Sequence, residues 1–345
     1  MPAPPSPSLP PRHRADVPNV RAGDPLAQAH AAFARDDFAA ALRGYEQALA
    51  GATGTDAAGL HLVVGLTLQR LVRNADAKRH YAAAVDLDPA SGKAPLMLAA
   101  MQMADQEWPQ AQASLEDAVR RAPGMAVAHF YLGQVYRKQG DAVRAEAHLK
   151  RAQAAMPDFP PLLHQLGAVR FEAGDREGAL AFFKAATKAQ PKDPASWTSL
   201  GLAYAAVDDW AKAIEGHRRA AELAPRDATI YFRLGWLLYK AGELDQAASC
   251  MREALQRDPA YLAAHFDLGI ILGRQGKLPE ANACFEQVLK LQPKHPDARF
   301  WLGVGLSLLD RKDEARQKFQ ELADLDPANE LIRETLTAFD AVLVH

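Results

Sequence analysis

The sequence of 345 residues contains only two cysteines, Cys250 and Cys284, and no run of 18 apolar residues. A helix needs about 20 apolar residues to cross a bilayer, so we expect no membrane insertion. An excess of one charge is also lacking, because 40 basic and 42 acidic side chains leave a net charge of −2. This balance gives no overall basic field for nucleic acid, and we expect no nucleic-acid partner.

Motifs that carry catalysis or hold cofactors are missing as well. The sequence has no H-E-x-x-H, no C-x-x-C, no histidine pair four residues apart, no Walker lysine and no G-x-S-x-G. Gly303 and Gly305 lack the third glycine of a phosphate-binding loop. The sequence therefore predicts a protein that is not an enzyme, with no catalytic residues, no metal site and no cofactor.

The sequence does contain a repeat, and proline shows it most directly. Eight prolines are spaced 34 residues apart without a slip: Pro89, Pro123, Pro157, Pro191, Pro225, Pro259, Pro293 and Pro327. Self-similarity at a fixed period of this length indicates structural units that stack on their neighbours.

The best-preserved repeat runs from Pro194 to Asp227, and Pro194 is numbered as position 1. Apolar or small residues at positions 4, 7, 8 and 11 form one stripe of a helix, and those at positions 20, 24 and 27 form a second: Trp197, Leu200, Gly201, Tyr204, then Ala213, His217, Ala220. A polar turn, Asp208-Asp209, separates them, and the proline at position 32 ends the second helix. Each repeat is therefore predicted to be a helix–turn–helix hairpin.

Small residues recur where the two helices of a hairpin face each other. Position 8 is glycine in seven repeats and position 20 is alanine in eight: Gly65, Gly133, Gly167, Gly201, Gly235, Gly269, Gly303, and Ala77, Ala111, Ala145, Ala179, Ala213, Ala247, Ala281, Ala315. Larger side chains there would overpack the hairpin at a cost of roughly 1–3 kcal/mol. Position 15 is glycine in four repeats, which predicts a left-handed residue at the end of the first helix: Gly140, Gly174, Gly242, Gly276.

This pattern resembles the tetratricopeptide repeat, whose signature W-x2-L-G-x2-Y…A-x3-F…P is matched from Trp197 to Pro225, with His217 in the phenylalanine slot. The resemblance implies an all-α fold, a right-handed superhelical solenoid of antiparallel helix hairpins. It covers residues 22–329 as nine repeats, which begin near residues 22, 58, 92, 126, 160, 194, 228, 262 and 296.

The segments outside the repeats differ in composition. Residues 1–21 hold seven prolines, so we expect a disordered tail, with a ligand for the protein's own groove as the alternative. Residues 330–345 carry one apolar stripe, which predicts a helix that caps the last repeat, with a partner-binding helix as the alternative. In the third repeat, Pro95 and Gln102 break the apolar pattern and predict a looser interface.

The cysteines and several histidines occupy repeat positions that suggest structural roles. Cys250 and Cys284 both stand at position 23, so they should lie a helix diameter apart, roughly 10 Å, which is beyond the reach of a disulfide. Free thiols suit a reducing compartment, and we expect a cytoplasmic protein. His61, His129 and His265 share position 4, and we interpret them as core histidines.

In tetratricopeptide solenoids, positions 2, 5, 9 and 12 of each first helix line the concave groove where extended peptides or helices lie. Here those positions are most apolar in repeats 7 to 9, with basic residues close by. The groove residues that we predict are Phe232, Trp236, Tyr239, Phe266, Ile270 and Phe300, with Arg233, Lys240 and Arg274. Two alternatives stay open: the position-5 aromatics could pack between repeats, and Arg233 could pair with Asp267.

The resemblance implies a non-enzymatic scaffold or adaptor that binds a protein partner in its groove. We expect the ligand to be a peptide segment or helix with apolar anchors and acidic character. Two alternatives come from other classes of function. One is self-assembly through the proline-rich tail or the helix at 330–345. The other is a docking arm for an enzyme on a separate chain.

Overall fold

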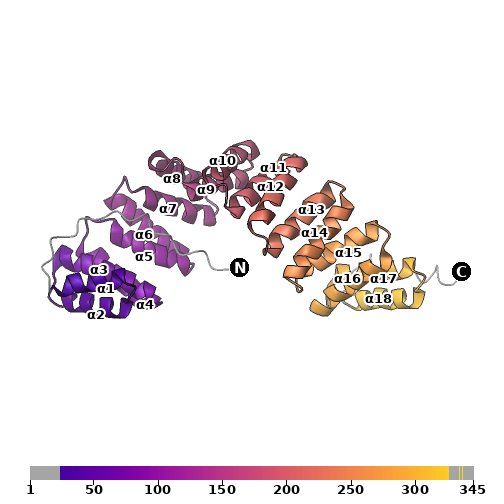
Figure 1. Ribbon diagram of the computed structural model, residues 1–345, viewed down its shortest axis with the longest axis horizontal. Helices are drawn as coiled ribbons and strands as arrows, with labels where there is room; N and C mark the ends of the chain where they lie inside the picture. Colours follow the sequence, from indigo (N-terminus) through magenta and orange to yellow (C-terminus); the bar gives the residue numbers. More distant parts are fainter. Residues whose placement is uncertain (1–23, 326–333, 335, 337–345) are drawn as a thin grey trace. The chain divides into compact units, whose positions relative to one another are not determined.

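The computed structural model describes residues 24–325 together with Glu334 and Leu336. Eighteen helices and no strand are found among residues 24–325 (Figure 1). In chain order the helices are α1 (Pro25–Ala34), α2 (Phe38–Leu49), α3 (Gly54–Arg70), α4 (Asn74–Leu87), α5 (Lys93–Ala104), α6 (Trp108–Arg121), α7 (Ala126–Lys138), α8 (Ala142–Ala155), α9 (Pro160–Glu172), α10 (Arg176–Ala189), α11 (Pro194–Ala206), α12 (Trp210–Leu223), α13 (Ala228–Lys240), α14 (Leu244–Arg257), α15 (Leu262–Arg274), α16 (Leu278–Leu291), α17 (Pro296–Leu308) and α18 (Lys312–Leu325).

These helices form two compact units, α1–α9 and α10–α18. Within each unit, the two helices of a hairpin pack against each other, and the second helix of one hairpin packs against the first helix of the next. The predicted all-α architecture of stacked helix hairpins is therefore confirmed. The handedness of the superhelix stays a prediction.

The two predicted terminal segments fall largely outside the described residues. Residues 1–21, the predicted tail, lie wholly outside them. Of the predicted capping helix at 330–345, Glu334 and Leu336 are described, and both are helical. Leu336 packs against the hydrophobic core of the C-terminal unit.

Each hairpin turn is set by a left-handed residue at position 15. The four predicted glycines have φ between 76° and 84°. In the remaining repeats within residues 24–325, a non-glycine residue takes the same conformation, with φ between 60° and 62°: Asp36, Val72, Gln106, Asp208 and Asp310. In three repeats an aspartate at position 16 then begins the second helix and accepts a hydrogen bond from the backbone N–H three residues later: Asp37, Asp141 and Asp209.

The contact between position 8 and position 24 joins the two helices of a hairpin. The glycine at position 8 lies directly beneath the side chain at position 24. A Cβ built on Gly269 would stand 2.7 Å from the ring of Phe285, and a Cβ on Gly303 would stand 2.8 Å from the ring of Phe319. The alanines at position 20 are fully buried beside this contact. The close approach predicted for these small residues is confirmed, and the glycine makes room for a side chain as well as for a backbone.

His217 fills position 24 of the sixth repeat and is fully buried against Gly201. Its Nδ1 donates a hydrogen bond to the carbonyl of Ala213 over 3.1 Å, while Nε2 has no hydrogen-bond partner among the described residues. Burial, with a contribution from the positive charge of Arg233, lowers the pKa of His217 from 6.5 to about 4. The imidazole is therefore held neutral at pH 7.

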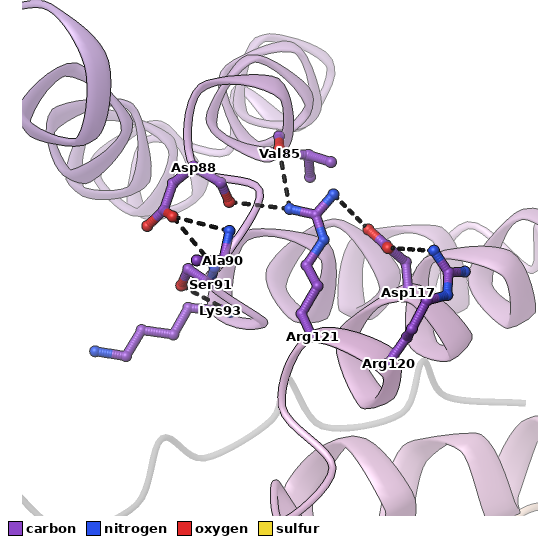
Figure 2. A network of polar contacts seen from close by, with 8 residues as sticks. All are labelled: Val85, Asp88, Ala90, Ser91, Lys93, Asp117, Arg120 and Arg121. Carbon is purple, nitrogen blue, oxygen red and sulfur yellow. Dashed lines mark hydrogen bonds and ion pairs between the residues drawn. The ribbon is translucent and has the colours of Figure 1, made fainter.

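Polar links connect successive repeats, and Figure 2 shows the one between the second and third repeats. The guanidinium of Arg121 donates to the carbonyls of Val85 and Asp88 at the end of α4, each over 3.0 Å, and pairs with Asp117 at 2.8 Å. Helix ends leave carbonyls without helical partners, so Arg121 satisfies part of this end of α4. The looser interface predicted for the third repeat stays a prediction.

Val72 offers a test of the turn geometry. A β-branched residue in the left-handed region is strained, and the Val72 side chain is 79% exposed, so it contributes little packing. We expect Val72→Gly to raise the free energy of unfolding by roughly 1 kcal/mol, measured as a higher thermal midpoint by circular dichroism. Val143→Gly is the matched control, because Val143 is equally exposed but lies within helix α8. That change should slightly destabilise the protein, and stabilisation by both substitutions would contradict the strain at Val72.

His217 should make stability depend on pH. The unfolded chain binds a proton at this histidine near pH 6.5, whereas the folded protein does so only near pH 4. The free energy of unfolding therefore falls as the pH drops from about 6.5 to about 4. We expect His217→Phe to reduce this loss, measured as the difference in thermal midpoint between pH 7 and pH 4.5. Some loss should remain, because burial also lowers the pKa of His80 and His148. An undiminished difference would show that His217 is not buried in its neutral form.

Candidate peptide-binding surface

The exposed face of the first helices in the C-terminal unit runs through positions 6, 9 and 13. In α13, Arg233, Trp236 and Lys240 are exposed, whereas Phe232 and Tyr239 are half-buried. Positions 6, 9 and 13 lie within about 60° of one another around a helix, which makes them one face. We call this face of α11, α13, α15 and α17 the C-terminal stripe. It consists of Ser199, Leu202, Ala206, Arg233, Trp236, Lys240, Asp267, Ile270, Arg274, Trp301, Val304 and Leu308.

The phenylalanines at position 5 lie beside this stripe and pack into the structure. Phe266 stacks on His295, with ring centroids 5.3 Å apart, and His295 is the residue that precedes α17. Phe232 contacts Tyr261, the residue that precedes α15, at 5.0 Å. Phe130 and Phe159 make the same contact in the N-terminal unit at 5.5 Å. An aromatic ring at position 5 therefore packs on an aromatic ring 29 residues later, at position 34, just before the first helix of the next repeat.

Phe300 also belongs to this packed layer. Its ring lies 6.1 Å from Phe319 of α18, and it packs against the core of the C-terminal unit together with Phe232 and Phe266. The side chains that we predicted as one groove thus divide into two sets. Phe232, Phe266, Phe300 and Tyr239 are half-buried against the core, whereas Arg233, Trp236, Lys240 and Arg274 are exposed. Ile270 is half-buried at the floor of the stripe.

Trp236 is the large exposed aromatic of α13, with 39% of its surface accessible. The ammonium of Lys240 lies 5.4 Å from the centroid of the Trp236 ring, and the guanidinium of Arg274 lies 4.8 Å from that of Tyr239. Both contacts are cation–π pairs that draw two cations close to the aromatic rings of α13. An apolar surface bordered by positive charge results.

The four charged residues of the stripe form no ion pair in the part of the chain that the structure describes: Arg233, Lys240, Asp267 and Arg274. Arg233 is exposed, and Asp267 is half-buried one repeat later at the same position 6. The cross-repeat ion pair that the sequence left open is not formed between them. Burial raises the pKa of Asp267, because no nearby cation offsets the loss of hydration.

Leu202, Trp301 and Asp267 belong to the stripe but were not among the groove residues predicted from the sequence. Leu202 is 39% exposed and Trp301 is 42% exposed. A signal for the packed phenylalanines was present in the sequence. Three repeats that carry phenylalanine at position 5 also carry Phe159, Tyr261 or His295 at position 34. That pairing of aromatic residues indicates contact between repeats.

Other parts of the described chain provide little that resembles a reactive site. Within residues 24–325, no group of three or more His, Cys, Asp or Glu side chains is arranged to hold a metal ion. A shallow hollow of about 430 Å³ beside α12 is lined by Trp197 and by charged side chains, of which Arg218 and Arg219 are bound to Gln246 and Glu222. It includes no residue of the C-terminal stripe.

The thiols and histidines are held in packed environments. Cys250 and Cys284 are free thiols, as expected, and burial raises the pKa of Cys284 to about 11. Of the three histidines predicted to lie in the core, His129 is buried and its Nδ1 lies 2.9 Å from Nδ1 of His148, whereas His61 and His265 are only half-buried. No described helix is both long and apolar enough to cross a bilayer.

Substitution by alanine should distinguish the packed layer from the exposed stripe by the loss of stability that it causes. We expect Phe266→Ala to lower the free energy of unfolding by roughly 2–3 kcal/mol, because it removes a ring that joins two repeats. Trp236→Ala should cost less than about 1 kcal/mol, because much of that side chain is already in water. Denaturation by urea, followed by circular dichroism, measures both. An equal loss of stability for the two variants would place Trp236 in the core.

Comparison with known proteins agrees with the observed architecture. One sequence model described as tetratricopeptide repeat matches residues 96–159, 207–261, 232–281 and 266–330, and a second with the same description matches residues 136–203. A search of curated proteins finds no match.

Several solved structures share the fold at low sequence identity. One chain in the crystal structure of the APC/C hetero-tetramer Cut9–Hcn1 is 16% identical to this chain. The TM-score is 0.54, over 82% of this chain and 55% of that chain. A tetratricopeptide repeat protein from Parabacteroides merdae ATCC 43184 is 17% identical with a TM-score of 0.52, over 72% of this chain and 98% of that chain. The MamA protein is 22% identical with a TM-score of 0.47, over 49% and 92% of the two chains.

At these identities the structural similarity is evidence for the fold alone. The sequence models are evidence for the family, and together they span residues 96–203 and 207–330. Those matches extend over well more than half of the chain and coincide with the helix hairpins seen in both units. The chain belongs to the tetratricopeptide repeat family.

Proposed function

We propose that this protein is a scaffold that binds a peptide segment of a partner protein on the C-terminal stripe. Its membership of the tetratricopeptide repeat family and its stacked helix hairpins support a role in protein interaction. The observation that carries the choice of surface is Trp236, which is 39% exposed between two cationic neighbours, Arg233 and Lys240. Exposed tryptophan and arginine are the residue types that most often dominate binding energy at interfaces.

The charge of the stripe favours a ligand with acidic character. Arg233, Lys240 and Arg274 are exposed, and none of them forms an ion pair with a residue that the structure describes. The cation–π contacts of Lys240 and Arg274 use the ring faces and leave their N–H groups available for carboxylates. An apolar side chain placed on Trp236 would then be bordered by two or three charge-assisted hydrogen bonds.

The packed phenylalanines have a supporting role in this proposal. Phe232 and Phe266 fix the spacing of α13, α15 and α17 through their contacts with Tyr261 and His295. A surface whose helices are held at fixed spacing loses little conformational entropy on binding. Binding on such a surface needs no catalysis by this chain.

Leu336 bears on the alternative of self-assembly. This side chain packs against the core of its own unit, which favours a capping role for Leu336 over exchange into a second copy. We therefore rank the partner-binding scaffold above self-assembly through the predicted helix at 330–345.

Peptide selection tests the proposed surface. The probe is a phage-displayed library of random peptides about 12 residues long, enough to span the four first helices of the stripe. We expect the wild-type protein to enrich peptides that combine an aromatic or aliphatic residue with acidic residues. Synthetic copies should lose affinity by about tenfold or more on Trp236→Ala, which removes the central anchor.

Val143→Ala provides the matched control, because Val143 is an exposed apolar residue in the N-terminal unit. It should leave the affinity unchanged. Peptides that bind Trp236→Ala as well as wild type would place the binding site elsewhere and would overturn the proposal.

A further inference from the structure

We infer that the ligand of the C-terminal stripe is a peptide with two opposite charges, an acidic side chain beside its apolar anchor and a basic side chain about one repeat away. This inference rests on the proposed function and adds the order of charges along the ligand. Arg233 would receive the acidic group, and Asp267 would receive the basic one.

The first observation is that Arg233 and Asp267 occupy the same register on neighbouring helices. Both stand at position 6, on α13 and α15, and these two helices contact each other within the C-terminal unit. Neither forms an ion pair with the other or with any other residue in the described part of the chain. Two opposite charges are thus presented side by side on one face without neutralising each other.

The second observation is that the other cations of the stripe form no ion pair with Asp267. Lys240 lies over Trp236, and Arg274, on the same helix as Asp267, lies over Tyr239. Asp267 is half-buried among the packed rings of the C-terminal unit, and burial raises its pKa. A carboxylate that has lost part of its hydration without a partner is destabilised, so a ligand cation that reaches it gains more than it would from a fully hydrated carboxylate.

The third observation concerns Arg233, whose surroundings leave it free for an anion. It is exposed beside Trp236, and His217, the buried histidine whose pKa the charge of Arg233 helps to lower, is held neutral by burial. An acidic side chain next to the ligand's anchor could therefore meet a guanidinium that has no competing carboxylate.

Helix geometry converts this arrangement into a spacing on the ligand. Packed helices lie about 8–10 Å apart, and an extended chain advances about 3.3 Å per residue. The acidic and basic groups of an extended ligand should therefore be about three residues apart. A ligand with the charges exchanged would place like charges against Arg233 and Asp267, which is how charged groups select between partners.

The test uses the same random peptide library on two forms of the full chain. One is the wild type, and the other is Arg233→Glu/Asp267→Lys, which exchanges the two charges. We expect peptides selected on the wild type to carry an acidic residue next to the apolar anchor and a basic residue about three positions away. Peptides selected on the exchanged variant should show the reverse order of charges around the same anchor.

Two conservative substitutions test the same charges with less effect on folding. A selected peptide should bind about fivefold or more weakly to Arg233→Gln and to Asp267→Asn, both of which keep the size of the side chain. The control Arg219→Glu/Glu222→Lys exchanges an exposed ion pair of α12 outside the stripe and should leave the selection unchanged. Circular dichroism establishes that each variant is folded.

The outcomes separate this inference from the proposed function. Peptides that depend on Trp236 but carry no fixed pair of opposite charges would overturn the inference and leave the proposed function standing. Unchanged peptide sequences on the exchanged variant would do the same. An absence of any peptide that depends on Trp236 would overturn both.

Discussion

The structure depends on one contact, in which the side chain at position 24 lies over the backbone of position 8. Where position 8 is glycine, as in Gly269 beneath Phe285, the two helices of a hairpin come close enough for a ring to fill the space between them. Close packing at this point fixes the angle of the hairpin, and that angle in turn determines which side of the first helix is left exposed.

Packing between repeats determines which face of each first helix stays exposed. Aromatic contacts such as that of Phe266 with His295 join one first helix to the residue that precedes the next first helix. They occupy the side of the helix that an unpaired hairpin would otherwise offer to water. What remains exposed is a neighbouring face on which Trp236 is surrounded by charge, so the proposed function assigns stability and recognition to adjacent residues of the same helix.

Much of the fold could be predicted from the sequence because its determinants are local and periodic. Each of these signals depends on one hairpin alone. The spacing from Pro191 to Pro225 marks where hairpins end, Ala213 marks close packing within a hairpin, and Gly242 marks a turn. The candidate surface was harder to predict, because a shift of one residue is a rotation of about 100° around a helix. Whether Phe232 faces water depends on Tyr261, which lies a full hairpin away in the sequence. Likewise, the missing ion pair between Arg233 and Asp267 depends on side-chain geometry that periodicity does not report.

The aromatic contact between position 5 and position 34 also has a consequence for how such a chain can grow. Both partners fall within one block of 34 residues, as Phe232 and Tyr261 do within residues 228–261. Duplication of that block copies the ring together with the ring on which it packs. The joint between repeats is thus inherited as a unit, and this chain can be lengthened or shortened without redesigning the surface where one repeat meets the next.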